Sequence, residues 1–213
     1  MLEILLPALR TSLVTCVLCG ILYPIAVTAL GQWLLPARAN GSLVKASDGV
    51  VLGSRWIGQQ WTGPEWFHGR PSATTGTDPN DPSKSVGAPY NAANSTGSNL
   101  GPTSKALLER LVADRAVLDR LQPELAGRAL PSDMLTASGS GLDPDISPAN
   151  AALQVARVAQ ARGVSPARVN ELLQQHIAGR SLGIFGEPRV NVLALNLGLE
   201  RVFPHPGRPR PAP

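Results

Sequence analysis

The sequence predicts an α+β fold in which a single N-terminal transmembrane helix is followed by one small mixed domain. Two observations support this: an uncharged apolar run near the N-terminus, and, after it, strand patterns early and late with helix patterns between them. We divide the chain into an anchor over residues 1–36, a domain over 37–202 and a disordered proline-rich tail over 203–213.

The apolar run extends from Thr11 to Leu35 without a charged side chain. At about 1.5 Å per helical residue, it covers the roughly 30 Å of hydrocarbon in a bilayer. A cleaved signal peptide has an apolar region of only about 7 to 15 residues. A buried core helix or an amphipathic surface helix could also produce an apolar run, but Tyr23-Pro24 in its middle would break a helix exposed to water. We therefore expect a permanent anchor that packs against partner helices.

The charged residues do not decide the direction in which the anchor crosses the membrane. Arg10 and the terminal amine on one side balance Arg38 and Lys45 on the other. The net charge of +4 lies after the anchor but is dispersed, and aromatic residues are few. No nucleic-acid binding is predicted.

The first part of the domain has the pattern of a hairpin followed by a long loop. Two β-branched runs flank Ser47-Asp48-Gly49, and an Asp-Gly between such runs is typical of a hairpin turn. The next forty residues, to about Pro102, are rich in Gly, Pro, Ser, Thr and Asn. A stretch of this length without regular structure indicates a functional or partner-ordered loop.

Three helices and a strand are predicted after this loop. The first helix begins at Thr103 or Ser104, and Ser147-Pro148 and Ser165-Pro166 open the other two. The second ends near residue 162 and the third at residue 179. Alternating leucines predict a strand from Arg189 to Arg201.

Motifs for catalysis are missing from the sequence. No P-loop precedes a lysine, no aspartate is followed by lysine as the phosphorylated residue of a P-type pump requires, and no Gly-x-Ser-x-Gly elbow occurs. Asp143 and Asp145 flank Pro144 and could face a cation, although a turn before a helix is the favoured interpretation. We predict no catalytic residues and no metal site, and the sequence leaves cofactor-binding residues unknown.

Several polar strings, most of them in the loops, together resemble one family, the C subunit of the Kdp potassium-transporting ATPase. The resemblance covers nearly the whole chain except the tail. The similar strings are Arg10, Tyr23-Pro24, Gly41-Ser42-Leu43-Val44, Gly53-Ser54, Ile57-Gly58-Gln59, Arg70-Pro71-Ser72-Ala73, Gly97-Ser98-Asn99-Leu100-Gly101-Pro102, Pro131, Asp133, Thr136-Ala137-Ser138-Gly139-Ser140-Gly141-Leu142-Asp143-Pro144, Ile146-Ser147, Gln154, Arg157-Val158-Ala159 and Gly186-Glu187-Pro188-Arg189-Val190-Asn191-Val192-Leu193.

The resemblance implies an accessory subunit in the bacterial cytoplasmic (inner) membrane. Its partners would be the lipid bilayer, a channel-like subunit that selects potassium and a P-type subunit that hydrolyses ATP. The family topology implies a cytoplasmic N-terminus and an extracytoplasmic domain. The family is also described as a catalytic chaperone that raises the ATPase subunit's affinity for ATP, which implies ATP as a possible ligand but no tightly bound cofactor.

Two loops are predicted to dock on the potassium-selecting subunit, over residues 61–73 and 95–102, since we expect them to combine exposed aromatic or amide side chains with few core-forming residues. Any single Gly or Pro in these loops could instead form a turn that the fold requires. An anchored extracytoplasmic hydrolase and a free-standing envelope binding protein are the competing candidate functions. The candidate docking residues are Trp61, Trp66, Phe67, Arg70, Ser98 and Asn99.

Overall fold

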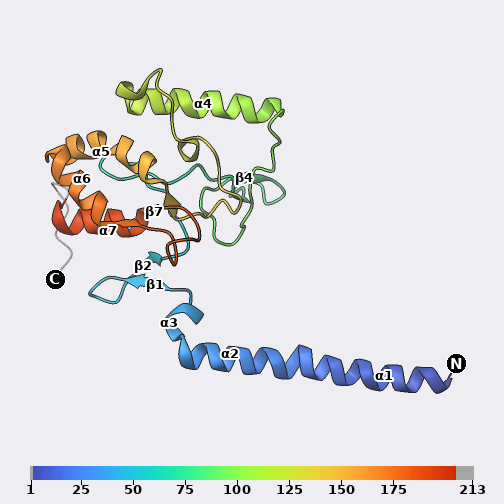
Figure 1. Ribbon diagram of the computed structural model, residues 1–213. Coiled ribbons are helices and arrows are strands. Elements are labelled where there is room, and N and C mark those ends of the chain that lie inside the picture. The colour runs from blue at the N-terminus through green and yellow to red at the C-terminus, as the bar shows by residue number, and fades with distance from the viewer. Residues whose placement is uncertain (1, 205–213) are drawn as a thin grey trace. The chain divides into compact units, whose positions relative to one another are not determined.

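The computed structural model describes residues 2–204, and the chain divides into two compact units, residues 1–43 and 44–213. Figure 1 shows the elements of each unit along the chain. The part of the predicted tail from residue 205 onward lies outside the described residues.

The first unit is a nearly continuous helix that is long and apolar enough to cross a membrane. It comprises α1 (Leu2–Val17), a π-helical turn (Leu18–Leu22) and α2 (Tyr23–Leu34), and a short α3 (Pro36–Ala39) follows. Its candidate span, Glu3–Leu34, has 32 residues and contains an 18-residue window with a mean hydropathy of 2.3. Pro24 has no N–H and its ring crowds the preceding turn, which accounts for the wider π turn just before it. The prediction of one apolar anchor helix is confirmed, and the helix begins earlier than Thr11.

The second unit begins with the predicted hairpin. Strand β1 (Leu43–Lys45) pairs with β2 (Val51–Ser54). The carboxylate of Asp48 accepts a hydrogen bond from the Val50 N–H at 3.0 Å, and Gly49 takes a φ of +85°. Asp-Gly supplies a side-chain acceptor and a residue that tolerates positive φ.

The long polar stretch contains a second hairpin that the sequence analysis missed. Strands β3 (Thr75–Thr77) and β4 (Ser85–Gly87) are antiparallel, with Thr75 opposite Gly87 and Thr77 opposite Ser85. Each strand has three mostly polar residues, too few for an alternating apolar pattern.

The three predicted helices are present, but the third ends at Gln175 and not at residue 179, because Ile177 and Ala178 form a strand. They are α4 (Lys105–Leu121), α5 (Pro148–Arg162) and α6 (Pro166–Gln175). The Ser147 hydroxyl accepts from the Asn150 N–H at 3.0 Å and so caps α5. Helix α4 has no buried residue, and its Leu108 and Val112 are both 62% exposed. Short 3-10 turns follow α4 at Pro123–Leu125 and Ser132–Met134.

The predicted strand over Arg189–Arg201 is wrong beyond its third residue. Strand β7 (Arg189–Asn191) is the middle strand of an antiparallel sheet between β5 (Asp145–Ile146) and β6 (Ile177–Ala178), and α7 (Val192–Val202) follows at once. The Asn191 side chain caps α7 by accepting from the Ala194 N–H at 3.0 Å. The alternating leucines concealed a helical spacing of the residues that α7 buries: Val192, Leu193, Leu195, Asn196 and Leu199.

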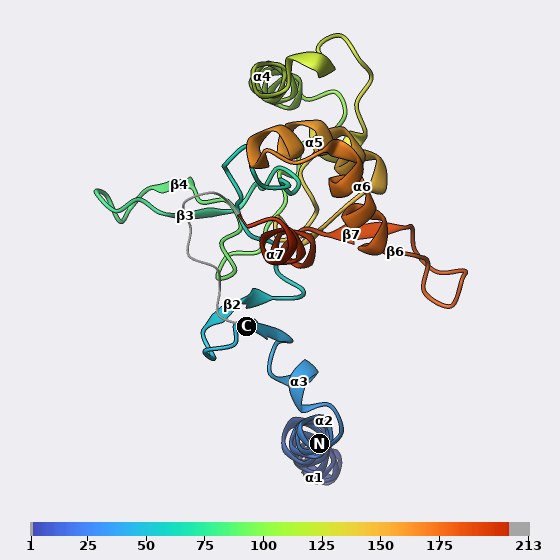
Figure 2. The same ribbon diagram turned by 90° about the vertical axis from the view of Figure 1, so that its left-hand side faces the viewer.

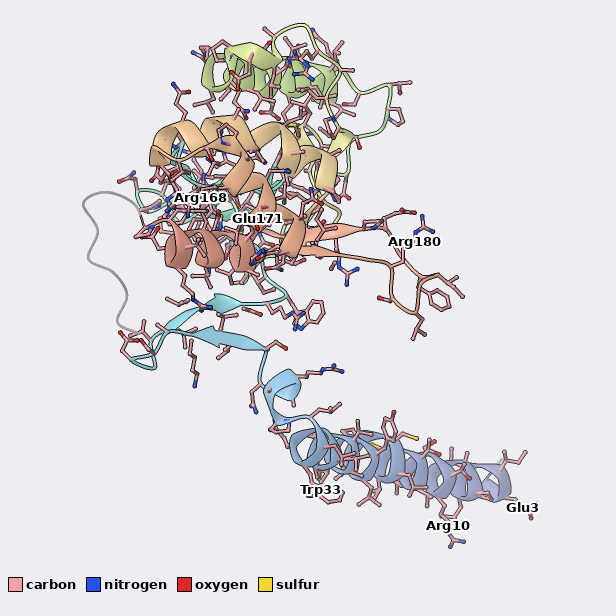
Figure 3. All side chains as sticks on the ribbon, turned by 60° about the vertical axis from the view of Figure 1, so that its left-hand side comes forward. Glu3, Arg10, Trp33, Arg168, Glu171 and Arg180 are labelled. Carbon is pink, nitrogen blue, oxygen red and sulfur yellow. The ribbon has the colours of Figure 1, made fainter. Side chains whose placement is uncertain are left out.

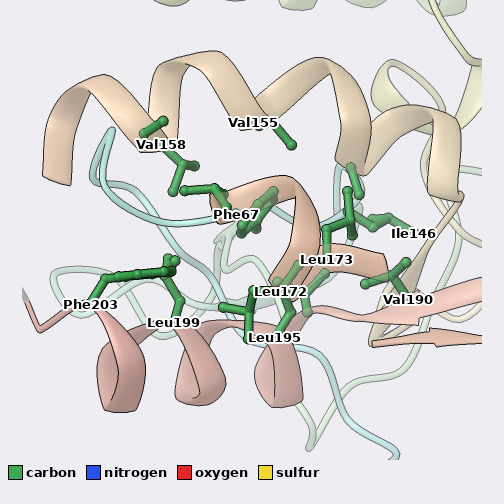
Figure 4. Close-up of a cluster of buried hydrophobic side chains, with 14 residues drawn as sticks. Phe67, Ile146, Val155, Val158, Leu172, Leu173, Val190, Leu195, Leu199 and Phe203 are labelled. Atoms are coloured by element: carbon green, nitrogen blue, oxygen red, sulfur yellow. The ribbon is translucent and has the colours of Figure 1, made fainter. Parts of the chain in front are cut away.

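The core lies where α5, α6 and α7 meet the small sheet. Figures 1 and 2 both show α5 between α4 and α7. Phe67 and Phe203 join this core from segments outside these helices, so Phe203, placed in the predicted tail, belongs to the fold. Figure 4 shows Phe67 in the middle of the cluster. Its buried members are Phe67, Ile146, Ala151, Val155, Val158, Ala159, Val169, Leu172, Leu173, Val190, Val192, Leu195, Leu199 and Phe203.

Asn191→Ala tests the junction between β7 and α7. The substitution removes the helix cap and the hydrogen bonds from the Asn191 amide to the Arg55 carbonyl and Asp145. We expect the free energy of unfolding to fall by about 1–2 kcal/mol. Urea denaturation of the full chain in mild detergent measures it. Asn191→Ser restores the cap alone and should recover about half of the loss; equal stability of all three proteins would contradict this assignment.

Candidate docking surface

The segment from Gly63 to His68, which we call the strap, has no regular structure and is held by polar side chains of α5 and α7. The Asn196 oxygen accepts from the Phe67 N–H and its amide donates to the Phe67 carbonyl, both at 2.9 Å. Phe67 and Asn196 are fully buried. One side chain therefore replaces the strand partner that the Phe67 backbone lacks.

Helix α5 holds the strap from its other side. Gln154 accepts from the His68 N–H at 2.7 Å and donates to the His68 carbonyl at 3.1 Å. Arg157 donates to the Pro64 carbonyl at 2.7 Å and to Gln154 at 2.7 Å. These polar residues face inward beside Val155 and Val158, so the inner surface of α5 is both apolar and hydrogen-bonding.

The expectation that Trp66 and Phe67 are exposed docking aromatics is wrong. Trp66 is 8% exposed, and the Arg162 guanidinium lies 4.5 Å from its ring centroid. Arg162 also donates to the Glu65 carbonyl at 2.9 Å and pairs with Glu200 at 2.9 Å. Trp66 and Phe67 thus fix the strap to the helices, because burying their rings stabilises the fold more than leaving them in water.

Arg70, which follows the strap in the chain, binds the loop before β5. Its guanidinium pairs with Asp143 at 3.0 Å and donates to the Ala137 carbonyl at 3.3 Å. The Tyr90 hydroxyl donates to the Arg70 carbonyl at 2.6 Å, and burial raises the pKa of Tyr90 to about 12, which keeps this donor protonated. Arg70 is therefore a positioning residue inside the domain.

The second predicted docking loop packs against the same loop before β5. Ser95 donates to the Ser140 carbonyl at 3.1 Å, and a Cβ on Gly97 would lie 2.8 Å from the Gly139 carbonyl oxygen. The close approach requires glycine at this position. Ser98 is half-buried, whereas Asn99 is exposed with a φ of +51°. Loops that are far apart in the sequence thus form one connected polar surface.

Asp143 and Asp145 form the predicted turn. The Asp143 carboxylate accepts from the Asp145 N–H at 3.0 Å and pairs with Arg70. Asp145 pairs with Arg189 at 3.2 Å. Among residues 2–204, no group of three or more His, Cys, Asp or Glu side chains is placed to hold a metal ion.

A cavity of about 390 Å³ opens between the strap, α4 and α5. Of the predicted docking residues, Trp61 and Arg70 line it, together with His68, Gln122 and Gln154. The ring centroids of Trp61 and Trp66 lie 4.9 Å apart with the ring planes tilted by 47°, and the buried indole N–H of Trp61 has no hydrogen-bond partner among the described residues. The cavity is therefore lined mainly by side chains that already serve the fold.

The interior hydrogen-bonding residues escaped sequence reasoning. Asn196, Gln154, Arg157 and Arg162 hold the strap, yet none was predicted as a functional residue. A signal was available for two of them, because Gln154 and Arg157 lie on the apolar face of the predicted helix, where an unpaired polar residue would be costly.

Asn196→Ala tests the attachment of the strap. The substitution leaves the buried N–H and carbonyl of Phe67 without partners, so we expect a loss of roughly 3 kcal/mol in the free energy of unfolding. Urea denaturation of the full chain in detergent measures it. Asn170→Ala, on the exposed face of α6, is the matched control and should change stability by less than about 0.5 kcal/mol. Similar effects from the two variants would contradict the assigned role of Asn196.

His68 should make stability depend on pH. Burial and the charge of Arg157 lower the pKa of His68 from 6.5 to about 4, so the neutral ring donates to the Gly63 carbonyl at 2.8 Å. Between these pH values the unfolded chain binds a proton that the folded chain does not. Stability contributed by neutral His68 is therefore complete above pH 6.5 and decreases as the pH falls to 4, by up to about 3 kcal/mol.

His68→Gln removes this titration. Urea denaturation at intervals from pH 7.5 to 4 should give a smaller loss of stability for the variant than for the unaltered chain. Parallel curves for the two proteins would show that His68 does not titrate as its surroundings require.

Comparison with known proteins gives a family and close relatives. The family described as K+-transporting ATPase, c chain (KdpC) matches residues 5–201. A protein of Rhodopseudomonas palustris strain BisB5 named potassium-transporting ATPase KdpC subunit is 54% identical over 94% of this chain and 98% of its own length. Proteins of the same name from Bradyrhizobium diazoefficiens and Methylobacterium nodulans are 53% and 54% identical, over 94% and 95% of this chain and 98% of their lengths.

Proposed function

The chain belongs to the KdpC family of potassium-transporting ATPase subunits, and on this premise we propose that it is the non-catalytic accessory subunit of an ATP-driven potassium import complex. The observation that carries the proposal is the extent of the likeness: relatives named as this subunit align with the anchor helix and the domain together. The role we assign is to stabilise the complex and to assist its ATP-hydrolysing subunit.

Docking on the potassium-selecting subunit is assigned to the exposed parts of the two predicted loops. Trp61 contributes the half-buried face of its ring to the lining of the cavity, and Asn99 presents an exposed amide. Arg70 and Ser98 support this surface from a half-buried position. Trp66 and Phe67 act indirectly, since they fix the strap, which lies between Trp61 and Arg70 in the chain.

The domain is placed outside the cytoplasm of a bacterial inner membrane, with the N-terminus inside. In this orientation the domain has no access to cytoplasmic ATP. We therefore propose that the subunit raises the ATP affinity of the ATP-hydrolysing subunit through contacts between the anchor and partner helices. The cavity beside Arg70 fits a triphosphate poorly, because that guanidinium is already paired with Asp143 and His68 is neutral. We expect aromatic and small residues of the anchor, rather than residues of the domain, to transmit this effect to the ATP-hydrolysing subunit.

Co-purification from native membranes tests the proposed function. The tagged chain, extracted in mild detergent, should bring down a P-type ATPase subunit and a channel-like subunit with potassium-stimulated ATPase activity. Trp61→Ala with Asn99→Ala should lower recovery of the channel-like subunit several-fold, whereas Lys105→Ala with Glu109→Ala, an exposed pair on α4, should leave it unchanged. Recovery of the folded chain alone would contradict the accessory role.

A further inference from the structure

An apolar finger, residues 180–187, closes the hairpin between β6 and β7. Leu182, Ile184 and Phe185 at its tip are 88%, 72% and 64% exposed. Figure 2 shows this loop extending away from α6 and α7, and Figure 3 marks its base at Arg180. A single exposed leucine needs no explanation, but three large apolar side chains on one small projection indicate a binding element.

The finger is held in shape by its own contacts. Ser181 and Phe185 exchange backbone hydrogen bonds at 2.8 and 2.9 Å, and Arg180 donates to both carboxylate oxygens of Glu187 at 2.7 Å. Leu182 takes a φ of +54°, an uncommon conformation for a bulky residue that the surrounding turn maintains. A loop that is already ordered loses little conformational freedom when it docks.

The size and charge of the finger distinguish between the partners that could bind it. Three side chains fall short of the roughly 800 Å² per partner that a stable interface buries, so the finger alone would not hold two copies of this chain together. Insertion into a bilayer surface is usually supported by unpaired basic residues. Here Arg180 is paired with Glu187, and the nearby Arg189 is paired with Asp145, so the base of the finger carries no net positive charge.

We propose that residues 182–185 insert into an apolar pocket on another subunit of the transporter complex. This proposal rests on the proposed accessory function and adds a contact separate from the Trp61 and Asn99 surface. The Arg180–Glu187 pair at the base offers one cationic and one anionic group to a polar pocket rim, while the tip supplies the apolar contact.

Site-specific photocrosslinking tests the proposal in native membranes. The photoreactive amino acid p-benzoylphenylalanine replaces Phe185 in the tagged full chain, and the products are identified after irradiation. A covalent adduct with another subunit of the complex is the expected result. An adduct with lipid only or with a second copy of this chain would overturn the proposal, as would the absence of any adduct while the complex still co-purifies. Failure of the complex to co-purify with the unaltered chain would instead overturn the proposed function.

Matched substitutions measure the contribution of the finger to assembly. Ile184→Ser with Phe185→Ser should lower recovery of the partner subunits by about tenfold. Leu108→Ser with Val112→Ser makes the same kind of change on the exposed face of α4 and should leave recovery unchanged. Circular dichroism confirms that both variants are folded. Unchanged recovery with the finger variant, or equal losses with both variants, would contradict a specific role for the finger.

Discussion

The hydrogen bonds between the Asn196 side chain and the backbone of Phe67 are the constraint on which the rest of the domain depends. They hold an irregular segment in the interior, where its N–H and carbonyl groups would otherwise be unpaired. With Phe67 fixed between α5 and α7, Gln154 and Arg157 can bind the flanking backbone. The helices pack around the ring of Phe67, which belongs to the strap, so the strap and the helices form one core.

The same arrangement explains how a polar, glycine-rich sequence is ordered. Arg70 follows the strap and binds the loop before β5, and the 95–97 segment packs on that loop through Ser95 and Gly97. Most of the contacts of this surface are therefore structural, and exposed residues such as Asn99, with the half-buried ring of Trp61, remain accessible to a partner. The apolar finger lies outside this network and has its own internal bonds, so it can bind without disturbing the core.

Local signals in the sequence predicted the anchor, the first hairpin and three helices, because a long apolar run, Asp-Gly and Ser-Pro each act over a few residues. The last helix was mistaken for a strand, since its leucines alternate while its buried side chains follow a helical spacing. The burial of Trp66 and Phe67 could not be predicted, because it depends on Asn196 and Arg162, which lie about a hundred residues or more away in the chain. The family could be recognised from the sequence because its strings include loop residues that make packing contacts, such as Arg70, Gly97 and Asp143.

Hydrogen exchange at the Phe67 and His68 amides, in the full chain in detergent, tests the role of the strap most directly. Both amides donate to buried or half-buried side chains, although neither belongs to a helix or strand. We predict exchange as slow as that of the inner residues of α5, because opening the strap requires unfolding the core. Exchange as fast as that of the β3–β4 turn would show that the strap opens by itself, and would contradict its place at the centre of the fold.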